Sequence, residues 1–151
     1  LVKDAGNGEV GRERFVEMTT GLRLASLEAD LAAYRYRQVI LVLTDPEQRR
    51  DYPPEASYYL GEAYRLRDEK GDLEDAEREF NRAIETAPQF APAHRALGLL
   101  YYKRGDTARA AQLLRRYLER APDATDRAYI EQYLAQMETN AARDKGLPSS
   151  P

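Results

Sequence analysis

An all-α fold built from stacked helical hairpins is predicted by three features of the amino-acid sequence. Apolar residues recur at three- and four-residue steps, the spacing that gathers them on one face of a helix. Two stretches of similar length, residues 54–90 and 91–124, each carry this pattern on both sides of a Gly-Asp pair. Apolar residues make up 42% and charged residues 32% of the chain, a mixture typical of helix-rich proteins with polar outer faces.

Residues 91–124 show the hairpin most clearly. Gly105 suits the left-handed backbone that ends a first helix, and Asp106 can accept a hydrogen bond from the free amides of a second. Pro122 then closes the unit, because proline cannot continue a helix. The apolar positions of the two helices are Ala93, Leu97, Leu100 and Tyr101, then Ala110, Leu113, Leu114, Tyr117 and Leu118. A single hairpin of this kind cannot bury all its apolar faces, so we expect a neighbouring copy.

Residues 54–90 supply that copy. The positions that match in the two stretches are Leu60-Gly61, Tyr64, Gly71-Asp72, Ala76, Phe80, Ala83 and Pro88 in one and Leu97-Gly98, Tyr101, Gly105-Asp106, Ala110, Leu114, Tyr117 and Pro122 in the other. This pattern resembles the tetratricopeptide repeat, in which W-x2-L-G-x2-Y, A-x3-F and P recur with a 34-residue period. The resemblance implies a right-handed superhelical stack of helix-turn-helix hairpins.

A degenerate first repeat is predicted over residues 12–53, after a flexible lead-in at residues 1–11. The lead-in has glycines, an asparagine and no helical periodicity. The helix that follows has an apolar stripe formed by Phe15, Met18, Leu22, Ala25, Ala29 and Ala32, broadened by Leu24, Leu27 and Leu31. Residues 19–21, Thr-Thr-Gly, are a weak point at which this helix could bend or break.

Residues 37–43 contain a continuous apolar run that, taken alone, could form a buried strand. The sequence offers no second strand to pair with it, and a lone strand would leave its backbone groups unsatisfied, so we predict a helix. Val39 precedes Ser57 by 18 residues, a spacing that also separates corresponding positions in the clearer repeats. Asp45 and Pro46 are expected either to end this helix early or to begin a short new one.

The second repeat contains three residues more than the third between its first glycine and its Gly-Asp pair, around residues 67–70. These extra residues have two interpretations. At 1.5 Å per residue they would lengthen the first helix by close to one turn, so that it projects beyond its neighbours. Alternatively, they form a longer loop and leave the helix unchanged.

A capping helix is predicted over residues 125–140, because a helical stack must cover the apolar side of its last repeat. Its apolar stripe consists of Tyr129, Ile130, Tyr133, Leu134 and Met137. Gln132 occupies the position where a further repeat would have glycine. The final residues, 141–151, have no core-forming pattern, and we expect them to be disordered.

Charge is unevenly distributed along the chain, although its net value is only −3. Residues 54–88 carry ten acidic and five basic side chains, whereas residues 89–122 carry two acidic and seven basic ones. These blocks are either solvated faces or surfaces that steer a charged partner or support self-association. Nucleic-acid binding by the basic block is not expected, because the sequence pI is about 5.4 and the acidic block lies one repeat away.

Nothing in the sequence argues for catalysis, a cofactor or a metal site. The chain has no cysteine and one histidine, His94, which stands where the repeat pattern has tryptophan and is expected to pack between helices. Five carboxylates, Asp72, Glu74, Asp75, Glu77 and Glu79, lie at the start of a predicted helix and are expected to fan outward. We therefore predict that the chain is not an enzyme.

The resemblance implies that the first helix of each hairpin lines a concave groove, where a partner would bind. Spacing from Gly61 and Gly98 then predicts the groove residues, which are Tyr58, Glu62 and Arg65 in the second repeat and Arg95, Leu99 and Tyr102 in the third. Each set follows i, i+4, i+7 and so occupies one helical stripe. Such a mixture of aromatic and charged side chains suits an extended peptide or a helix of another protein.

The sequence thus predicts a protein–protein interaction scaffold, by analogy part of a larger bacterial assembly or envelope protein. The alternative is a regulatory or substrate-delivery arm of an enzyme, such as a metalloprotease, whose catalytic domain lies outside these residues. Because the chain begins with Leu1 rather than methionine, we expect it to be part of a longer protein. No signal peptide or membrane span is visible, which leaves a soluble location in the cytoplasm or periplasm open.

Overall fold

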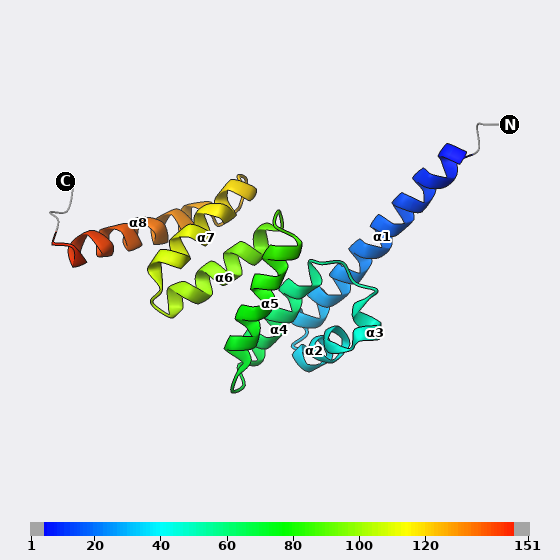
Figure 1. Cartoon of the computed structure of the whole chain (residues 1–151), viewed down its shortest axis with the longest axis horizontal. Helices are drawn as coiled ribbons and strands as arrows, with labels where there is room; N and C mark the ends of the chain where they lie inside the picture. The colour runs from blue at the N-terminus through cyan, green and yellow to red at the C-terminus, as the bar shows by residue number, and fades with distance from the viewer. Residues whose placement is uncertain (1–4, 147–151) are drawn as a thin grey trace. The chain divides into compact units, whose positions relative to one another are not determined.

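The computed structural model of the chain describes residues 5–146, and side chains from residue 8 onward. Throughout this part of the chain the regular structure is α-helical, which confirms the predicted all-α fold (Figure 1). The helices of the described residues are α1 (Ala5–Ala32), α2 (Tyr36–Thr44), α3 (Pro46–Arg49), α4 (Ala56–Arg67), α5 (Asp72–Thr86), α6 (Ala91–Lys103), α7 (Thr107–Arg120) and α8 (Arg127–Asp144).

Contacts within the chain divide it into two compact units, Leu1–Thr86 and Ala87–Pro151. The first unit contains α1 to α5 and the second contains α6 to α8. The sequence predicts one repeat domain over residues 12–140, and the observed division, between Thr86 and Ala87, falls near the end of its second repeat, residues 54–90. Each unit contains one closely packed hairpin, α4 with α5 in the first and α6 with α7 in the second.

Gly61 allows α4 and α5 to approach closely within the first unit. A Cβ atom placed on Gly61 would lie 2.6 Å from both Cδ1 and Cε1 of Phe80, which is too close for any real contact. The Phe80 side chain is fully buried, as are Ala76 and Ala83 on the same face of α5. Gly71 has a φ of 90°, the left-handed conformation that its place in the turn requires. The predicted hairpin pattern is therefore confirmed in this unit.

The extra residues of the second repeat form a loop and do not lengthen the helix. Helix α4 has 12 residues and ends at Arg67, whereas its counterpart α6 has 13. Asp68 ends α4 with a φ of 54°, and its backbone N–H donates to the Tyr64 carbonyl oxygen at 3.1 Å. Of the two interpretations offered by the sequence, the longer loop, residues 68–71, is correct.

The α6–α7 hairpin of the second unit has the same construction. A Cβ atom on Gly98 would lie 2.9 Å from Cγ and Cδ2 of Leu114, a fully buried residue of α7. Gly105 ends the turn with a φ of 81°. The Asp106 side chain accepts a hydrogen bond at 3.1 Å from the backbone N–H of Arg109 and thereby caps α7. Both turn residues act as the sequence predicts.

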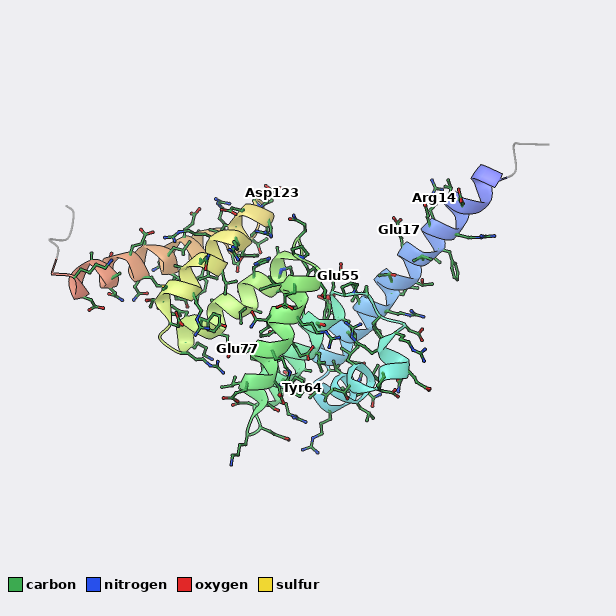
Figure 2. All side chains as sticks on the ribbon, in the orientation of Figure 1. Arg14, Glu17, Glu55, Tyr64, Glu77 and Asp123 are labelled. Atoms are coloured by element: carbon green, nitrogen blue, oxygen red, sulfur yellow. The ribbon has the colours of Figure 1, made fainter. Side chains whose placement is uncertain are left out.

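Helix α1 differs from the prediction at its start and in the face that it buries. It is helical from Ala5, so the lead-in expected at residues 1–11 is not a loop in its described part, and it continues without a break past Gly21. The main expected stripe of Phe15, Met18, Leu22, Ala25, Ala29 and Ala32 is exposed. The residues expected to broaden it form the covered face instead, with Leu27 buried and Leu24 and Leu31 half-buried. The neighbouring face is the one that contacts α2 and α4, near the C-terminal end of α1. Arg14 and Glu17 lie on the part of α1 that has no neighbouring helix in its unit (Figure 2).

Residues 37–43 are helical, as predicted, and belong to α2. Val39 is fully buried and Leu43 is 3% exposed, so the run supplies part of the core of the first unit. Asp45 follows α2 and caps α3 by accepting a hydrogen bond at 2.9 Å from the Glu47 backbone N–H. Both alternatives for Asp45 and Pro46 therefore hold, because α2 ends and a short new helix begins at the same place.

Helix α8 packs against α7 through Ile130, Leu134 and Met137, all buried. It runs from Arg127 to Asp144, four residues beyond the predicted capping helix of residues 125–140. The start of the tail predicted to be disordered, residues 141–144, is therefore helical, and residues 147–151 lie outside the described residues. None of the helices in the described part of the chain has the length and hydropathy of a membrane span.

Candidate functional site

Tyr58, Glu62 and Arg65 lie on one stripe of α4, as their spacing predicts, and all three side chains are half-buried. The Tyr58 ring packs against Tyr59, with ring centroids 5.0 Å apart, and against Phe80, with centroids 6.1 Å apart. Part of this aromatic surface therefore belongs to the core of the first unit.

Glu62 and Arg65 neutralise one another. Arg65 donates from Nε to Glu62 Oε1 and from Nη2 to Glu62 Oε2, both at 2.8 Å. The hydrogen bond to Glu62 is the largest cause of the raised pKa of Arg65, and it outweighs the opposing effect of burial. This stripe therefore offers a partner a tyrosine ring beside a closed ion pair rather than two separate charges.

The predicted stripe of α6 is partly covered by the last helix of the second unit. Arg95 donates from Nε to Asp126 Oδ2 at 2.6 Å, directly before α8. Tyr102 packs against Tyr133 of α8 with ring centroids 4.7 Å apart, and its hydroxyl donates to Gln136 Oε1 at 3.2 Å. Two of the three predicted residues of this repeat thus have partners within the chain, and Leu99 between them is half-buried.

Asp126 connects three helices of the second unit. In addition to Arg95 from α6, it accepts a hydrogen bond from the hydroxyl of Tyr117 on α7 at 2.6 Å. Burial opposes ionisation of Asp126, but the hydrogen bonds from Tyr117 and Arg95 outweigh it and lower its pKa. Burial and the same hydrogen bond raise the pKa of Tyr117 to about 12. The carboxylate thus holds the start of α8 against the hairpin.

Sequence reasoning missed the aromatic surface that α8 adds to the stripe of α6. Tyr133 packs on Tyr129 as well as on Tyr102, with the Tyr129 and Tyr133 ring centroids 4.6 Å apart and their hydroxyls hydrogen-bonded. Tyr129 is 51% exposed. We call Tyr102, Tyr129 and Tyr133 the tyrosine cluster. Tyr129 and Tyr133 are four residues apart and so lie on one face of α8. This spacing is the sequence signal from which the tyrosine cluster could have been predicted.

His94 has a structural role, as the sequence predicts. It is 1% exposed, and its Nε2 lies 2.9 Å from the carbonyl oxygen of Pro88, to which it donates. Arg120 donates to the same carbonyl oxygen from Nε at 2.6 Å. Burial lowers the pKa of His94, so the folded state favours the neutral imidazole.

Acidification should therefore destabilise the second unit. Below the pKa of about 6.5 of an unfolded histidine, the unfolded chain binds a proton that buried His94 resists, so the free energy of unfolding should fall by up to about 1.4 kcal/mol per pH unit. Urea unfolding at pH 7.5, 6.5 and 5.5 measures this slope. In a His94→Gln variant the slope over this range should flatten, since the chain has no other histidine. An equal slope in both proteins would contradict the assignment.

The acidic group at the start of α5 does not simply fan outward. Asp72 is 1% exposed and accepts two hydrogen bonds from Arg67, at 2.9 Å from Nε and 2.6 Å from Nη2. Glu79 is 7% exposed, and burial raises its pKa. The expectation that these two side chains point to solvent is wrong. Asp72 accepts a hydrogen bond at 2.9 Å from the backbone N–H of Glu69 in the α4–α5 turn, and Glu79 lies on the buried face of α5 with Ala76 and Ala83. Within the described residues, no group of three or more His, Cys, Asp or Glu side chains could hold a metal ion.

The architecture defines a helical-repeat protein, since each unit contains a hairpin closed by glycine at the helix crossing and by a left-handed glycine in the turn. A family model of the tetratricopeptide repeat matches residues 65–125, which include all of α5, α6 and α7. Residues 65–125 therefore carry tetratricopeptide repeats, and the resemblance noted in the sequence is confirmed over this stretch. No curated protein matches the chain closely enough to indicate a more specific relationship.

Proposed function

We propose that the chain is a non-catalytic interaction module that binds a peptide segment or a domain of another protein, within a larger bacterial assembly or envelope protein. The repeat family is the first support, since its members commonly serve as interaction scaffolds. The second is the tyrosine cluster, because partly exposed tyrosines supply large rigid contact areas and are enriched at binding hot spots. The tyrosine cluster is the observation that carries the proposal.

Each unit offers its own contact surface in this proposal. In the first unit it is the α4 stripe of Tyr58, Glu62 and Arg65, and in the second it is Arg95 and Leu99 together with the tyrosine cluster. Within these surfaces Glu62 is already paired with Arg65 and Asp126 with Arg95, so the charged groups are largely satisfied within the chain. The aromatic rings would then provide most of the affinity.

A pull-down with the intact chain, followed by titration of each captured protein, tests this proposal. The double variant Tyr58→Ala, Tyr129→Ala should weaken binding by at least about tenfold, the effect of losing about 1.4 kcal/mol. Tyr129 is chosen because it is the most exposed ring of the tyrosine cluster. Leu41→Ala and Leu73→Ala, which truncate exposed apolar residues elsewhere, serve as the matched control.

The affinities of the tyrosine variant show whether partners bind the proposed surfaces or other parts of the chain. If the tyrosine variant retains every partner with wild-type affinity while its circular dichroism is unchanged, the chosen surfaces are wrong. Sedimentation at low and high salt should be run alongside, because association that disappears in salt would assign the charge blocks of residues 54–88 and 89–122 to self-association.

A further inference from the structure

A pocket of about 470 Å³ opens in the first unit, and its lining includes none of the three residues of the α4 stripe. Its lining combines two aromatic rings with three guanidinium groups and a single carboxylate. The lining residues are Tyr34 and Arg35 between α1 and α2, Tyr36, Arg37 and Gln38 at the start of α2, Arg67 at the end of α4, and Glu69 in the loop of residues 68–71. Neither the repeat pattern nor the proposed function uses this pocket.

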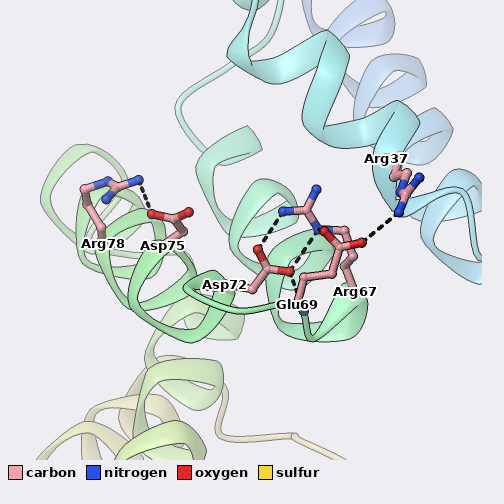
Figure 3. Close-up of polar contacts among 6 residues, drawn as sticks. All are labelled: Arg37, Arg67, Glu69, Asp72, Asp75 and Arg78. Carbon is pink, nitrogen blue, oxygen red and sulfur yellow. Dashed lines mark hydrogen bonds and ion pairs between the residues drawn. The ribbon is translucent and has the colours of Figure 1, made fainter.

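Arg67 is the fixed member of the pocket. Its guanidinium donates two hydrogen bonds to Asp72, whose side chain is 2% exposed (Figure 3). This buried carboxylate fixes the position of the guanidinium. The hydrogen bond to Asp72 raises the pKa of Arg67 and keeps it charged. A guanidinium group has donors on more than one edge, so pairing with Asp72 does not use all of them.

Glu69 shows how a carboxylate is held in this pocket. Its Oε1 accepts a hydrogen bond from Arg37 Nη2 at 2.8 Å, and its Oε2 lies 3.4 Å from Arg67 Nε (Figure 3). The side chains of Arg37 and Glu69 are 82% and 46% exposed, so water screens their ion pair and it contributes little to stability. Glu69 is therefore a carboxylate placed between two arginines on a surface loop, where another carboxylate can replace it.

Two aromatic rings, those of Tyr34 and Tyr36, line the pocket. The Tyr34 side chain is 80% exposed, and its ring packs edge-on against Tyr36 with centroids 6.1 Å apart. Tyr34 has a φ of 61°, a conformation that bulky residues rarely adopt, and the backbone is held there by bonds from Tyr34 N–H to the Leu31 carbonyl and from Arg35 N–H to the Asp30 carbonyl. An exposed ring fixed beside arginines suits peptide contact.

We propose that this pocket binds side-chain carboxylates of an acidic segment of another protein, and that Glu69 occupies the position between Arg37 and Arg67 until that segment displaces it. The carboxylate of Glu69, already held between Arg37 and Arg67, identifies the occupant. Arg35 is paired with Asp30 at 2.7 Å and Arg67 with Asp72, so the Arg37–Glu69 pair is the most exposed of the three and the one that a partner's carboxylate opens most easily. Glu69 is thus an internal competitor for the site. This binding site is additional to the surfaces of the proposed function and does not depend on them.

Fluorescence anisotropy with the intact chain tests the proposal. The probe is a fluorescein-labelled hexapeptide of four glutamates and two tyrosines, with an amidated C-terminus so that only side-chain carboxylates are offered. Arg37→Ala should weaken binding about tenfold, and Glu69→Gln should tighten it about two- to fivefold by removing the competitor. Binding of the wild-type chain should weaken as salt is raised.

The chain provides a matched control for each variant. Arg78 and Asp75 form an ion pair of 2.7 Å on α5, outside the pocket (Figure 3). Arg78→Ala and Asp75→Asn make the same changes in net charge as the two pocket variants and should leave the affinity unchanged. If they shift binding as much as Arg37→Ala and Glu69→Gln do, only the overall charge of the chain is involved and the proposal fails.

Three further results would overturn the proposal. The first is no binding of the glutamate peptide at 1 mM. The second is equal binding of the corresponding glutamine peptide, which carries no carboxylate. The third is binding of a phosphoserine peptide but not of the glutamate peptide, which would make the pocket a phosphate site. Because Tyr58 and Tyr129 lie outside the pocket, the variant of those two residues should still bind the probe, and this separates failure here from failure of the proposed function.

Discussion

Replacing Phe80 with alanine should lower the free energy of unfolding by about 3–5 kcal/mol, the usual loss for a fully buried aromatic ring. Phe80 has no exposed surface, and its ring fills the space that Gly61 leaves between α4 and α5. It also supports Tyr58, whose ring centroid lies 6.1 Å away. Truncation would therefore leave a cavity at the centre of the hairpin. Urea unfolding followed by far-ultraviolet circular dichroism measures the loss.

Phe15→Ala is the matched control for this experiment. Phe15 is 62% exposed on the part of α1 that has no neighbouring helix in its unit. The same truncation should there change the free energy of unfolding by no more than about 0.5 kcal/mol. Similar losses for the two phenylalanines would mean that burial in the α4–α5 hairpin does not distinguish them, contrary to the structure.

The second large effect is expected at Gly61, where alanine should destabilise the first unit by about 1–3 kcal/mol. Alanine normally favours a helix over glycine by about 1 kcal/mol, so the expected sign is opposite to helix propensity. The reason is the position of the new methyl group, 2.6 Å from two carbons of the Phe80 ring. A ring packed in the core cannot move aside as an exposed flexible side chain would.

Gly21→Ala provides the control for propensity. Gly21 lies within α1, and nothing lies within 4 Å of a Cβ atom placed there, so alanine should stabilise the chain by up to about 1 kcal/mol. A double-mutant cycle then tests the contact directly: in a Phe80→Leu background, the penalty of Gly61→Ala should shrink. An undiminished penalty would show that the ring is not what opposes the methyl group.

Most of the fold could be predicted from the sequence because its signals are local. The glycine of each Gly-Asp pair predicted the left-handed backbone that the structure shows at Gly71 and Gly105. The helix at residues 37–43 followed from backbone hydrogen bonding. The buried face of α1 could not be predicted, since two adjacent faces are apolar and only the position of α2 and α4 selects the one with Leu27.

The candidate sites were less predictable because they join residues that are distant in the sequence. Helical spacing placed Tyr58, Glu62 and Arg65 on one stripe, but it could not show that Glu62 and Arg65 bond to one another. Nor could it show that α8 contacts the stripe of α6, since those contacts depend on the path of the chain after Pro122. The pocket could not be predicted either, because it is formed by the α1–α2 turn together with the loop after α4.

The account rests on the close approach of α4 and α5 at Gly61, because the hairpin, the core and the stripe of Tyr58 all depend on it. Nuclear Overhauser spectroscopy on the isotope-labelled chain measures that approach directly. We predict strong cross-peaks between the Hα protons of Gly61 and the ring protons of Phe80, together with a ring-current shift of those Hα protons. Their absence from a spectrum in which both residues are assigned would contradict the packed hairpin.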